Sequence, residues 1–173
     1  GRTLGGGSAI NAMIYIRGQA QDYDQWRDLG CHGWGHDDVL PYFRRSEGNE
    51  RLANDLHGTE GPLKVSDLSY THPLSRAFVR AAQQCGIPHT DDFNGFAQDG
   101  AGFFQTTTFS GRRGSAAVTY LNPVKENPLL KVLTGCEVVR ISIKDGRAQG
   151  VVFRTANGAV QEAVAHQEVV LAA

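Results

Sequence analysis

The sequence is short of the features that assign a chain to several broad classes of protein. None of its apolar runs approaches the ~18 residues that cross a membrane, so we expect no membrane span. Long basic runs are missing too, and 17 basic against 18 acidic residues leave a net charge of -1. This balance argues against binding to nucleic acid or to an anionic membrane surface.

Cysteine is scarce and poorly spaced for metal binding or disulfides. Cys31, Cys85 and Cys136 lie far apart, are odd in number, and form neither a C-x-x-C pair nor a zinc-type spacing. We therefore expect three unpaired thiols in a reducing compartment, which slightly favours the cytoplasm, and we expect no metal site.

What the sequence does contain is ordinary for a globular protein, apart from its glycine. The apolar fraction is 40% and the charged fraction is 20%. The 21 glycines exceed the usual share of about 7%, and they cluster in turns rather than in a repeat. A chain of 173 residues is long enough for one domain with a substantial core.

The start of the chain predicts short helices separated by glycine-rich turns. Residues 1–7 are expected to form a loop, because consecutive glycines are costly inside a regular element. Ser8 is expected to cap a short helix that runs to Met13. The segment 22–30 then predicts a second helix, which its final glycine ends.

The next segment predicts one more helix and a loop. The helix DDVLPYFRRSE is expected to be capped by Asp37 or Asp38, with Pro41 near its first turn, where a missing N–H costs little. Residues 51–67 are polar, rich in turn residues and weakly patterned. We expect a surface excursion there, which ends in a short strand over residues 63–65.

The centre of the chain predicts two helices with a strand between them. HPLSRAFVRAAQQCG is the clearest helix in the sequence, and residues 103–109 form a strand rich in aromatic and β-branched residues. Ser115 is expected to cap the helix SAAVTYL. The first of these helices carries an apolar stripe of Leu74, Phe78, Ala81, Ala82 and Cys85.

The last part of the chain changes character and predicts an antiparallel β-meander. Five short β-rich runs follow one another: LLKVLTG, CEVVRISIKDG, AQGVVFRTANG, AVQEAVAHQ and EVVLAA. Asp145-Gly146 and Asn157-Gly158 lie between them, and these dipeptides are typical of two-residue hairpin turns.

The glycine triplet at residues 5–7 can serve binding or packing. Residues without side chains let the backbone approach an anion, and a following helix N-terminus adds partial positive charge. The turn is not a Walker loop, because no Gly-Lys-Ser/Thr follows, and G-x-G-x-x-G after a strand occurs nowhere in the chain. From the residues alone, a phosphate or cofactor contact and a tight structural turn both stay open.

A series of motifs extends along the chain in a fixed order. GRTLGGGSAINAMIYIRG at residues 1–18 is followed by DYDQW, WGHDDVLPYF, HGTEGP, DFNG, GRRGS and finally EVVLAA. In this order the motifs resemble the glucose-methanol-choline (GMC) oxidoreductases, flavoenzymes that oxidise alcohols with FAD. The resemblance covers essentially the whole chain and is nearest to the choline-dehydrogenase-like branch.

The resemblance implies an α+β fold. Such a chain would be a fragment of an FAD/NAD(P)-binding α/β domain plus part of an antiparallel substrate-domain sheet, ending in a β-meander. Residues 1–45 would belong to the FAD-binding domain, 46–128 to the substrate-binding domain and linking segments, and 129–173 to the meander that returns to the FAD-binding domain. We also expect an internal fragment, with the ADP-binding strand-turn-helix ahead of residue 1 and the catalytic histidine beyond residue 173.

The same resemblance implies noncovalent FAD as the cofactor. Some family members tether the flavin through a histidine in the first motif, whereas here Ile10 precedes Asn11 and no histidine lies before Asp28. Asn11 would supply both a donor and an acceptor to the cofactor. The expected cofactor-binding residues are Leu4, Gly6, Gly7, Ser8, Asn11, Ala12, Met13, Ile14 and Val138.

The resemblance implies no catalytic residue within this chain. Family chemistry needs a histidine base near the flavin, and none of the six histidines matches its position. We expect all six in surface or turn positions, with His57 in a structural turn near the substrate domain. Asp91 and Asp92 are interpreted as solvated or capping carboxylates, and Arg112 and Arg113 as a structural pair that ties loops to the boundary of the flavin domain.

The implied activity is oxidation of a small-molecule alcohol to an aldehyde or ketone by hydride transfer to FAD, with oxygen or another electron acceptor reoxidising the flavin. We expect this chain alone to be inactive and to bind FAD weakly. One wall of the substrate cavity would include residues among Phe103, Phe104 and Phe109, although alternate strand residues face opposite sides. Two alternatives stay open: a flavin-containing lyase or decarboxylase on the same fold, and a non-catalytic binding module.

Overall fold

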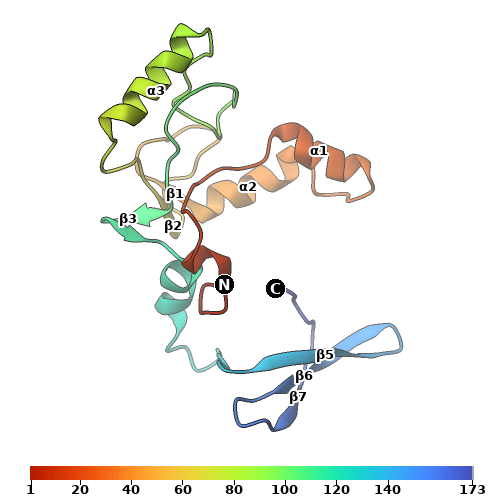
Figure 1. Ribbon diagram of the computed structural model, residues 1–173. Helices are drawn as coiled ribbons and strands as arrows, with labels where there is room; N and C mark the ends of the chain where they lie inside the picture. The colour runs from red at the N-terminus through yellow and green to blue at the C-terminus, as the bar shows by residue number, and fades with distance from the viewer. Residues whose placement is uncertain (173) are drawn as a thin grey trace. The chain divides into compact units, whose positions relative to one another are not determined.

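The computed structural model of the protein describes residues 1–172 and contains both helices and strands (Figure 1). It divides into two compact units, Gly1–Glu126 and Asn127–Ala173, and each is described by itself. The mixture of helices and an antiparallel sheet confirms the predicted α+β class. The assignment of residues 1–45, 46–128 and 129–173 to functional domains stays a prediction.

The glycine turn forms a 3-10 helix, η1 (Gly6–Ala9), and the helix predicted from Ser8 to Met13 is wrong. Gly5, with φ of 89°, starts the turn in the left-handed region that glycine tolerates. The Ser8 hydroxyl donates back to the Gly5 carbonyl instead of capping a following turn. Met13 has φ of 62°, a conformation through which no right-handed helix continues.

The helix α1 (Ala20–Asp28) confirms the second predicted helix and starts slightly earlier than expected. Its first residues are stabilised by the Asp22 carboxylate, which accepts a hydrogen bond from the Gln19 amide at 2.8 Å. Gly30 follows the last turn with φ of 106°, which lets the chain leave the helix without a clash of a Cβ atom.

The helix α2 (His36–Ser46) lies beside α1 in Figure 1. The prediction that Asp37 or Asp38 occupies its N-cap is wrong, because Gly35 holds that position. Asp38 still contributes, since its carboxylate accepts a hydrogen bond from the Gly35 amide at 3.0 Å. Pro41 lies inside the helix rather than near its first turn, so it removes one backbone hydrogen bond from the helix interior.

The helix α3 (Pro73–Gln84) is confirmed with its predicted start and end. The His72 ring caps it by accepting a hydrogen bond from the Leu74 amide at 3.1 Å. The predicted apolar stripe is present, but within this unit it faces solvent: Leu74 is 73% exposed and Phe78 is 74% exposed. Val79 is the buried residue of this helix.

Two short parallel strands, β1 (Glu47–Asn49) and β2 (Leu63–Val65), pair with Glu47 opposite Leu63. The strand at Leu63–Val65 is confirmed, whereas β1 replaces the expected end of the preceding helix. The surface excursion predicted over residues 51–67 is wrong in part, because Leu56 and His57 are buried. The loop between the two strands is mostly exposed, and Leu56 and His57 turn inward from it.

The strand predicted over residues 103–109 is much shorter than expected. It is reduced to β3 (Thr108–Phe109), which pairs antiparallel with β4 (Arg112–Arg113). Before it, Thr106 makes isolated bridges to Ser66 and Ile14. These bridges tie the segment to two neighbours on different sides and prevent one long ladder from forming.

The helix expected after Ser115 is a π-helical turn, η2 (Ala117–Leu121), followed by a 3-10 turn, η3 (Asn122–Val124). The Ser115 hydroxyl accepts a hydrogen bond from the Val118 amide at 3.4 Å, which agrees with the predicted capping role. Asn122, the residue before Pro123, keeps right-handed helical angles (φ of -55° and ψ of -40°), so the helical path continues from η2 into η3.

The centre of the first unit is largely polar. Tyr23 packs against Phe43 with ring centroids 5.6 Å apart, which joins α1 to α2. Among the described residues of this unit the buried hydrophobic side chains are few: Tyr23, Leu56, Val65 and Val79. The buried polar and charged side chains are Glu47, Asn49, His57, Thr90, Asn94, Gln105, Thr106 and Ser115. Buried polar groups require partners, so a hydrogen-bond network organises this unit.

The second unit confirms the predicted meander. Its strands β5 (Glu137–Lys144), β6 (Arg147–Arg154) and β7 (Val160–Val164) form one antiparallel sheet in that order. Asp145 and Gly146 have φ values of 51° and 73°, as a type I′ hairpin turn requires. The flanking runs LLKVLTG and EVVLAA form no strand among the residues described here.

Candidate functional site

The glycine turn presents an open face. A Cβ atom added at Gly6 or Gly7 would have no other atom within 4 Å, apart from its immediate chain neighbours and the turn's own backbone. Gly5 is different, because a Cβ there would lie 3.3 Å from atoms of Ser115 and Ala117. One side of the turn therefore packs against the chain, and the other is free for the close approach of a ligand.

Two residues hold this turn in place: Arg113 on β4 and Ala116 just after it. The Ser8 hydroxyl accepts a hydrogen bond from the Ala116 amide at 2.9 Å. The Arg113 Nη1 atom donates to the Ser8 carbonyl at 3.1 Å and to both the carbonyl and the side-chain oxygen of Asn11 at 2.8 Å. Arg113 thus has the structural role that was expected of it, and it fixes the turn from a distant part of the sequence.

Asn11 and Met13 form the second bend of this segment. The Asn11 side-chain oxygen accepts from the Met13 amide at 3.0 Å as well as from Arg113. The acceptor half of Asn11 is thus engaged within the protein, and its side-chain NH₂ is the half that can serve a ligand. The Met13 carbonyl accepts from the Thr107 amide at 2.8 Å, which anchors the far side of the bend.

Eight of the nine predicted cofactor-binding residues lie on this one continuous segment. Leu4 and Ile14 are 50% and 46% exposed, and their apolar side chains flank the open turn in sequence. The ninth, Val138, lies on β5 of the second unit, pairs with Phe153 on β6 and is 58% exposed. The eight residues of the first unit are Leu4, Gly6, Gly7, Ser8, Asn11, Ala12, Met13 and Ile14.

The first unit contains a buried charge cluster of Arg17, Glu47, His57 and Asp92, of which Arg17 lies three residues after the predicted cofactor segment in sequence. Glu47 and His57 have fully buried side chains, and the Arg17 side chain is 6% exposed. The His57 Nδ1 atom lies 2.8 Å from Glu47 Oε1, and its Nε2 atom lies 3.0 Å from Asp92 Oδ2. Arg17 Nη2 pairs with the other oxygen of Glu47. Two basic and two acidic side chains therefore balance one another inside the unit.

The environment of the cluster favours its charged form. Burial by itself would lower the pKa of His57, but hydrogen bonds to Glu47 and Asp92 and their negative charges outweigh it, so the pKa is raised above its ordinary value. Burial would raise the pKa of Glu47, yet hydrogen bonds from His57 and Asn49 and the charge of Arg17 hold it below its ordinary value.

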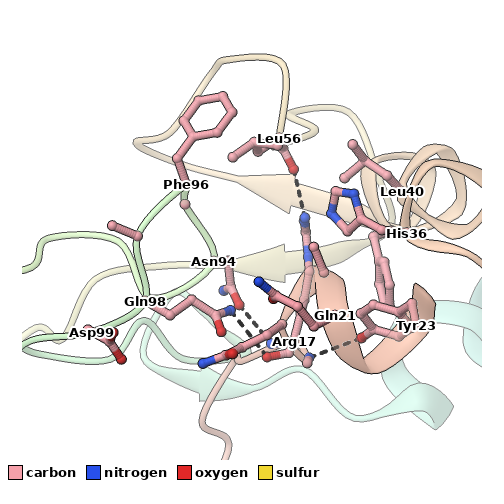
Figure 2. Close-up of a pocket in the computed structure, with 16 residues that line it drawn as sticks. Arg17, Gln21, Tyr23, His36, Leu40, Leu56, Asn94, Phe96, Gln98 and Asp99 are labelled. Carbon is pink, nitrogen blue, oxygen red and sulfur yellow. Dashed lines mark hydrogen bonds between the residues drawn. The ribbon is translucent and has the colours of Figure 1, made fainter. Parts of the chain in front are cut away.

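Arg17 also lines a cavity of about 410 Å³ beside α1 and α2. Its guanidinium donates to the Leu56 carbonyl, as Figure 2 shows, over a distance of 2.7 Å. The Tyr23 hydroxyl accepts a hydrogen bond from the Gly18 amide at 3.0 Å. The guanidinium carbon of Arg17 lies 5.1 Å from the centre of the Phe43 ring. Residues 94–99 form the opposite wall of this cavity.

Sequence reasoning missed the cluster. The expected surface or turn position of His57 is wrong with respect to burial, since its side chain has no exposed area. Asp92 does act as a turn carboxylate, accepting from the Asn94 amide at 2.9 Å, but its other oxygen contacts His57. Members that follow one another in sequence are 30, 10 and 35 residues apart. No local pattern links residues at such spacings.

The remaining histidines occupy the expected turn and terminal positions. His36 begins α2, His72 caps α3, and His89 lies in a loop where its ring contacts the Ala101 carbonyl and Asp91 at 2.9 Å each. Among residues 1–172, no three His, Cys, Asp or Glu side chains are arranged to hold a metal ion. No helix in this part of the chain is long and apolar enough to cross a membrane.

The three phenylalanines do not share one wall within the described residues. Phe103 borders a small hollow beside Tyr15. Phe104 stacks on Phe93 with ring centroids 4.3 Å apart, and Phe109 borders a different hollow, to which Arg113 also contributes. This agrees with alternate residues facing opposite sides, and the expectation that residues among the three line the substrate cavity stays a prediction.

Comparison with known proteins gives matches over the whole chain. The family model described as GMC oxidoreductase matches residues 1–173. The chain is 43% identical to the oxygen-dependent choline dehydrogenase of Rhizobium johnstonii, over all of this chain and 31% of that protein. It is also 43% identical to the mitochondrial choline dehydrogenase of Homo sapiens, over 99% of this chain and 29% of that protein.

A solved structure shares the fold. An FAD-dependent oxidoreductase from Chaetomium thermophilum matches with a TM-score of 0.85 and 27% identity, over 92% of this chain and 30% of that one. The chain thus spans about three tenths of the length of the relatives it matches.

Proposed function

The chain belongs to the GMC oxidoreductase family, and on this premise we propose that the whole protein is an FAD-dependent oxidoreductase acting on the CH–OH group of a small-molecule alcohol. The product is an aldehyde or a ketone. The observation that carries the proposal is the match of the whole chain to this family, together with the open glycine turn at the position of the family's first signature.

FAD, when bound, supplies the hydride acceptor, and the alcohol oxygen gives up its proton to a base. The residues present fit such a cofactor. Gly6 and Gly7 leave space for close approach of the flavin nucleotide, and the exposed Leu4 and Ile14 side chains supply apolar contact. The NH₂ group of Asn11 supplies a donor, since its side-chain oxygen is held by Arg113 and Met13.

The remaining residues of the segment shape the site. Ser8 and Met13 set its two bends, and Ala12 lies between them. Val138, on β5 of the second unit, stays a predicted FAD contact. The cofactor is held noncovalently, because the segment offers no histidine for a covalent bond to the flavin. Arg113 keeps the backbone of the segment fixed, so that binding costs less ordering of the chain.

The substrate is a small-molecule alcohol, and choline is the first to test because choline dehydrogenases are among the relatives of this chain. Oxygen or another electron acceptor takes the electrons in the second half of the reaction. The contribution of this chain is cofactor binding rather than the base, since none of its six histidines matches the position of the histidine base in the family.

The test is anaerobic titration of the purified whole protein with choline and then with a panel of aliphatic and aromatic alcohols. We expect a bound flavin whose visible absorption band bleaches with one of these alcohols, with formation of the matching carbonyl. A bound flavin that no alcohol bleaches would favour a lyase or decarboxylase. A protein that folds and binds no FAD would favour a non-catalytic module.

A further inference from the structure

None of the cofactor contacts proposed above involves the buried charge cluster of Arg17, Glu47, His57 and Asp92. The cluster joins four separate parts of the first unit. Resting on the proposed function, we propose that His57 is a positioning residue. As an imidazolium between Glu47 and Asp92, it fixes the segment that binds FAD.

The contacts of the His57 ring define its protonation. Both ring nitrogens face carboxylate oxygens, at 2.8 Å for Nδ1 and 3.0 Å for Nε2. A carboxylate only accepts hydrogen bonds, so both nitrogens must donate, and only the imidazolium has two donors. The fourth charged side chain in the cluster is Arg17, which contacts the other oxygen of Glu47.

The first route from His57 to the cofactor segment passes through Glu47 and Arg17. Glu47 is held by His57 through one oxygen and by Arg17 through the other. The Arg17 amide donates to the Asn94 side chain at 2.7 Å, and the Asn94 side chain donates to the Tyr15 carbonyl at 3.2 Å. Tyr15 directly follows Ile14, the last predicted FAD contact of this segment.

The second route passes through Asn49 and Gln105. The Asn49 side chain donates to Glu47 at 2.8 Å and to the Gln105 side chain at 2.7 Å. The Gln105 carbonyl accepts from the Tyr15 amide at 2.9 Å. Both routes therefore end on the backbone of Tyr15, and both begin at the carboxylate that His57 holds.

Loss of the proton breaks this arrangement. A neutral ring can donate from one nitrogen only, so either Glu47 or Asp92 loses its partner. If Glu47 loses this bond, its Oε1 atom keeps only the Asn49 amide as a partner in a fully buried position, and the lost charge-assisted hydrogen bond is costly. The network then relaxes around Glu47, and the order of Tyr15 and Ile14 declines with it.

The sign of the pH dependence follows from the two carboxylates. They raise the pKa of His57 in the folded protein, so the contribution is complete below the ordinary histidine value of about 6.5 and is lost as the pH rises through the raised value. FAD affinity is therefore expected to be steady below about pH 6.5 and to fall as the pH rises through the raised pKa of His57.

The test compares His57→Gln with His89→Gln in the whole protein. His89 is the matched control, because it also contacts a carboxylate, Asp91, but is 44% exposed and lies outside the cluster. The dissociation constant of FAD is measured by flavin fluorescence from about pH 6 to about pH 9. We expect His57→Gln to weaken FAD binding about tenfold at the lowest pH measured and to abolish the fall in FAD affinity as the pH rises. We expect His89→Gln to match the wild type at every pH.

A second variant, Asp92→Asn, covers the case in which His57→Gln does not fold. Removing one carboxylate lowers the pKa of His57, so the transition in FAD affinity shifts to lower pH. A transition that stays at the wild-type pH overturns the proposal, as does a His57→Gln protein with wild-type affinity and pH profile. In both results FAD still binds, so the proposed function stands. A wild-type protein without FAD binding would overturn both.

Discussion

The guanidinium of Arg113 donates to both the carbonyl and the side-chain oxygen of Asn11, at 2.8 Å each. It thereby joins the β3–β4 hairpin to the segment that carries the predicted FAD contacts. The two residues lie 102 positions apart in the sequence. The shape of the glycine turn is consequently set by a distant arginine as well as by its own glycines.

Replacing Arg113 by lysine is expected to weaken FAD binding about tenfold, because a lysine cannot reproduce the forked contacts of a guanidinium. The dissociation constant of FAD, measured by flavin fluorescence, checks this result. Arg112→Lys is the matched control, since Arg112 is exposed and precedes the contact residue on the same strand. Equal affinities in the two variants would contradict the role given to Arg113.

Replacing Glu47 by glutamine is expected to lower the free energy of unfolding by about 3–5 kcal/mol, because it leaves Arg17 and His57 as buried cations with too few partners. Chemical denaturation of the whole protein measures the change. The control is Glu60→Gln, on an exposed loop of the same region. A Glu47→Gln protein as stable as this control would show that the cluster contributes little.

The stability of the first unit is expected to decline toward both extremes of pH. The pKa of Glu47 is lowered on folding, so its contribution is present above its unfolded value of about 4.3 and is lost as the pH falls through the folded value. The pKa of His57 is raised, so its contribution is lost as the pH rises through the folded value. Thermal unfolding measured across pH checks both declines in stability. The decline at higher pH should be absent in His57→Gln.

Gly150 is required where β6 meets β7. A Cβ atom there would lie 2.1 Å from the Ala163 carbonyl oxygen, so Gly150→Ala is expected to destabilise the meander by about 3 kcal/mol. A Cβ atom at Gly158 meets no neighbour within 4 Å, and only the φ of 86° disfavours an alanine there. Gly158→Ala is therefore expected to lower the free energy of unfolding by about 1 kcal/mol. Hydrogen exchange of the β7 amides measures both, and equal effects would contradict the account.

Elements defined by neighbouring residues could be predicted from the sequence. The meander follows from two hairpin dipeptides, of which Asp145-Gly146 adopts the positive φ values that its turn type needs. The helix α3 follows from its periodicity and from the glycine and proline that end it. The protein family could be identified from motifs such as the glycine turn, because the residues of each motif are contiguous in the sequence.

Features that depend on distant partners could not be predicted in this way. The turn at Gly6–Ala9 is a 3-10 helix because Ser8 bonds backward and Arg113 holds Asn11 from afar. His57 is buried because Glu47 and Asp92 neutralise it, and these residues share no local pattern with it. Periodicity marks the apolar stripe of α3, but it does not say what covers that stripe.

The central claim is that the open face of the glycine turn receives FAD, and substitution of Gly7 tests it most directly. An alanine at Gly7 meets no neighbouring atom within 4 Å and needs no positive φ, so folding should be unchanged. We predict that Gly7→Ala keeps the wild-type melting temperature of the apoprotein and weakens FAD binding, with a larger loss for Gly7→Leu. Wild-type FAD affinity in both variants would contradict the account.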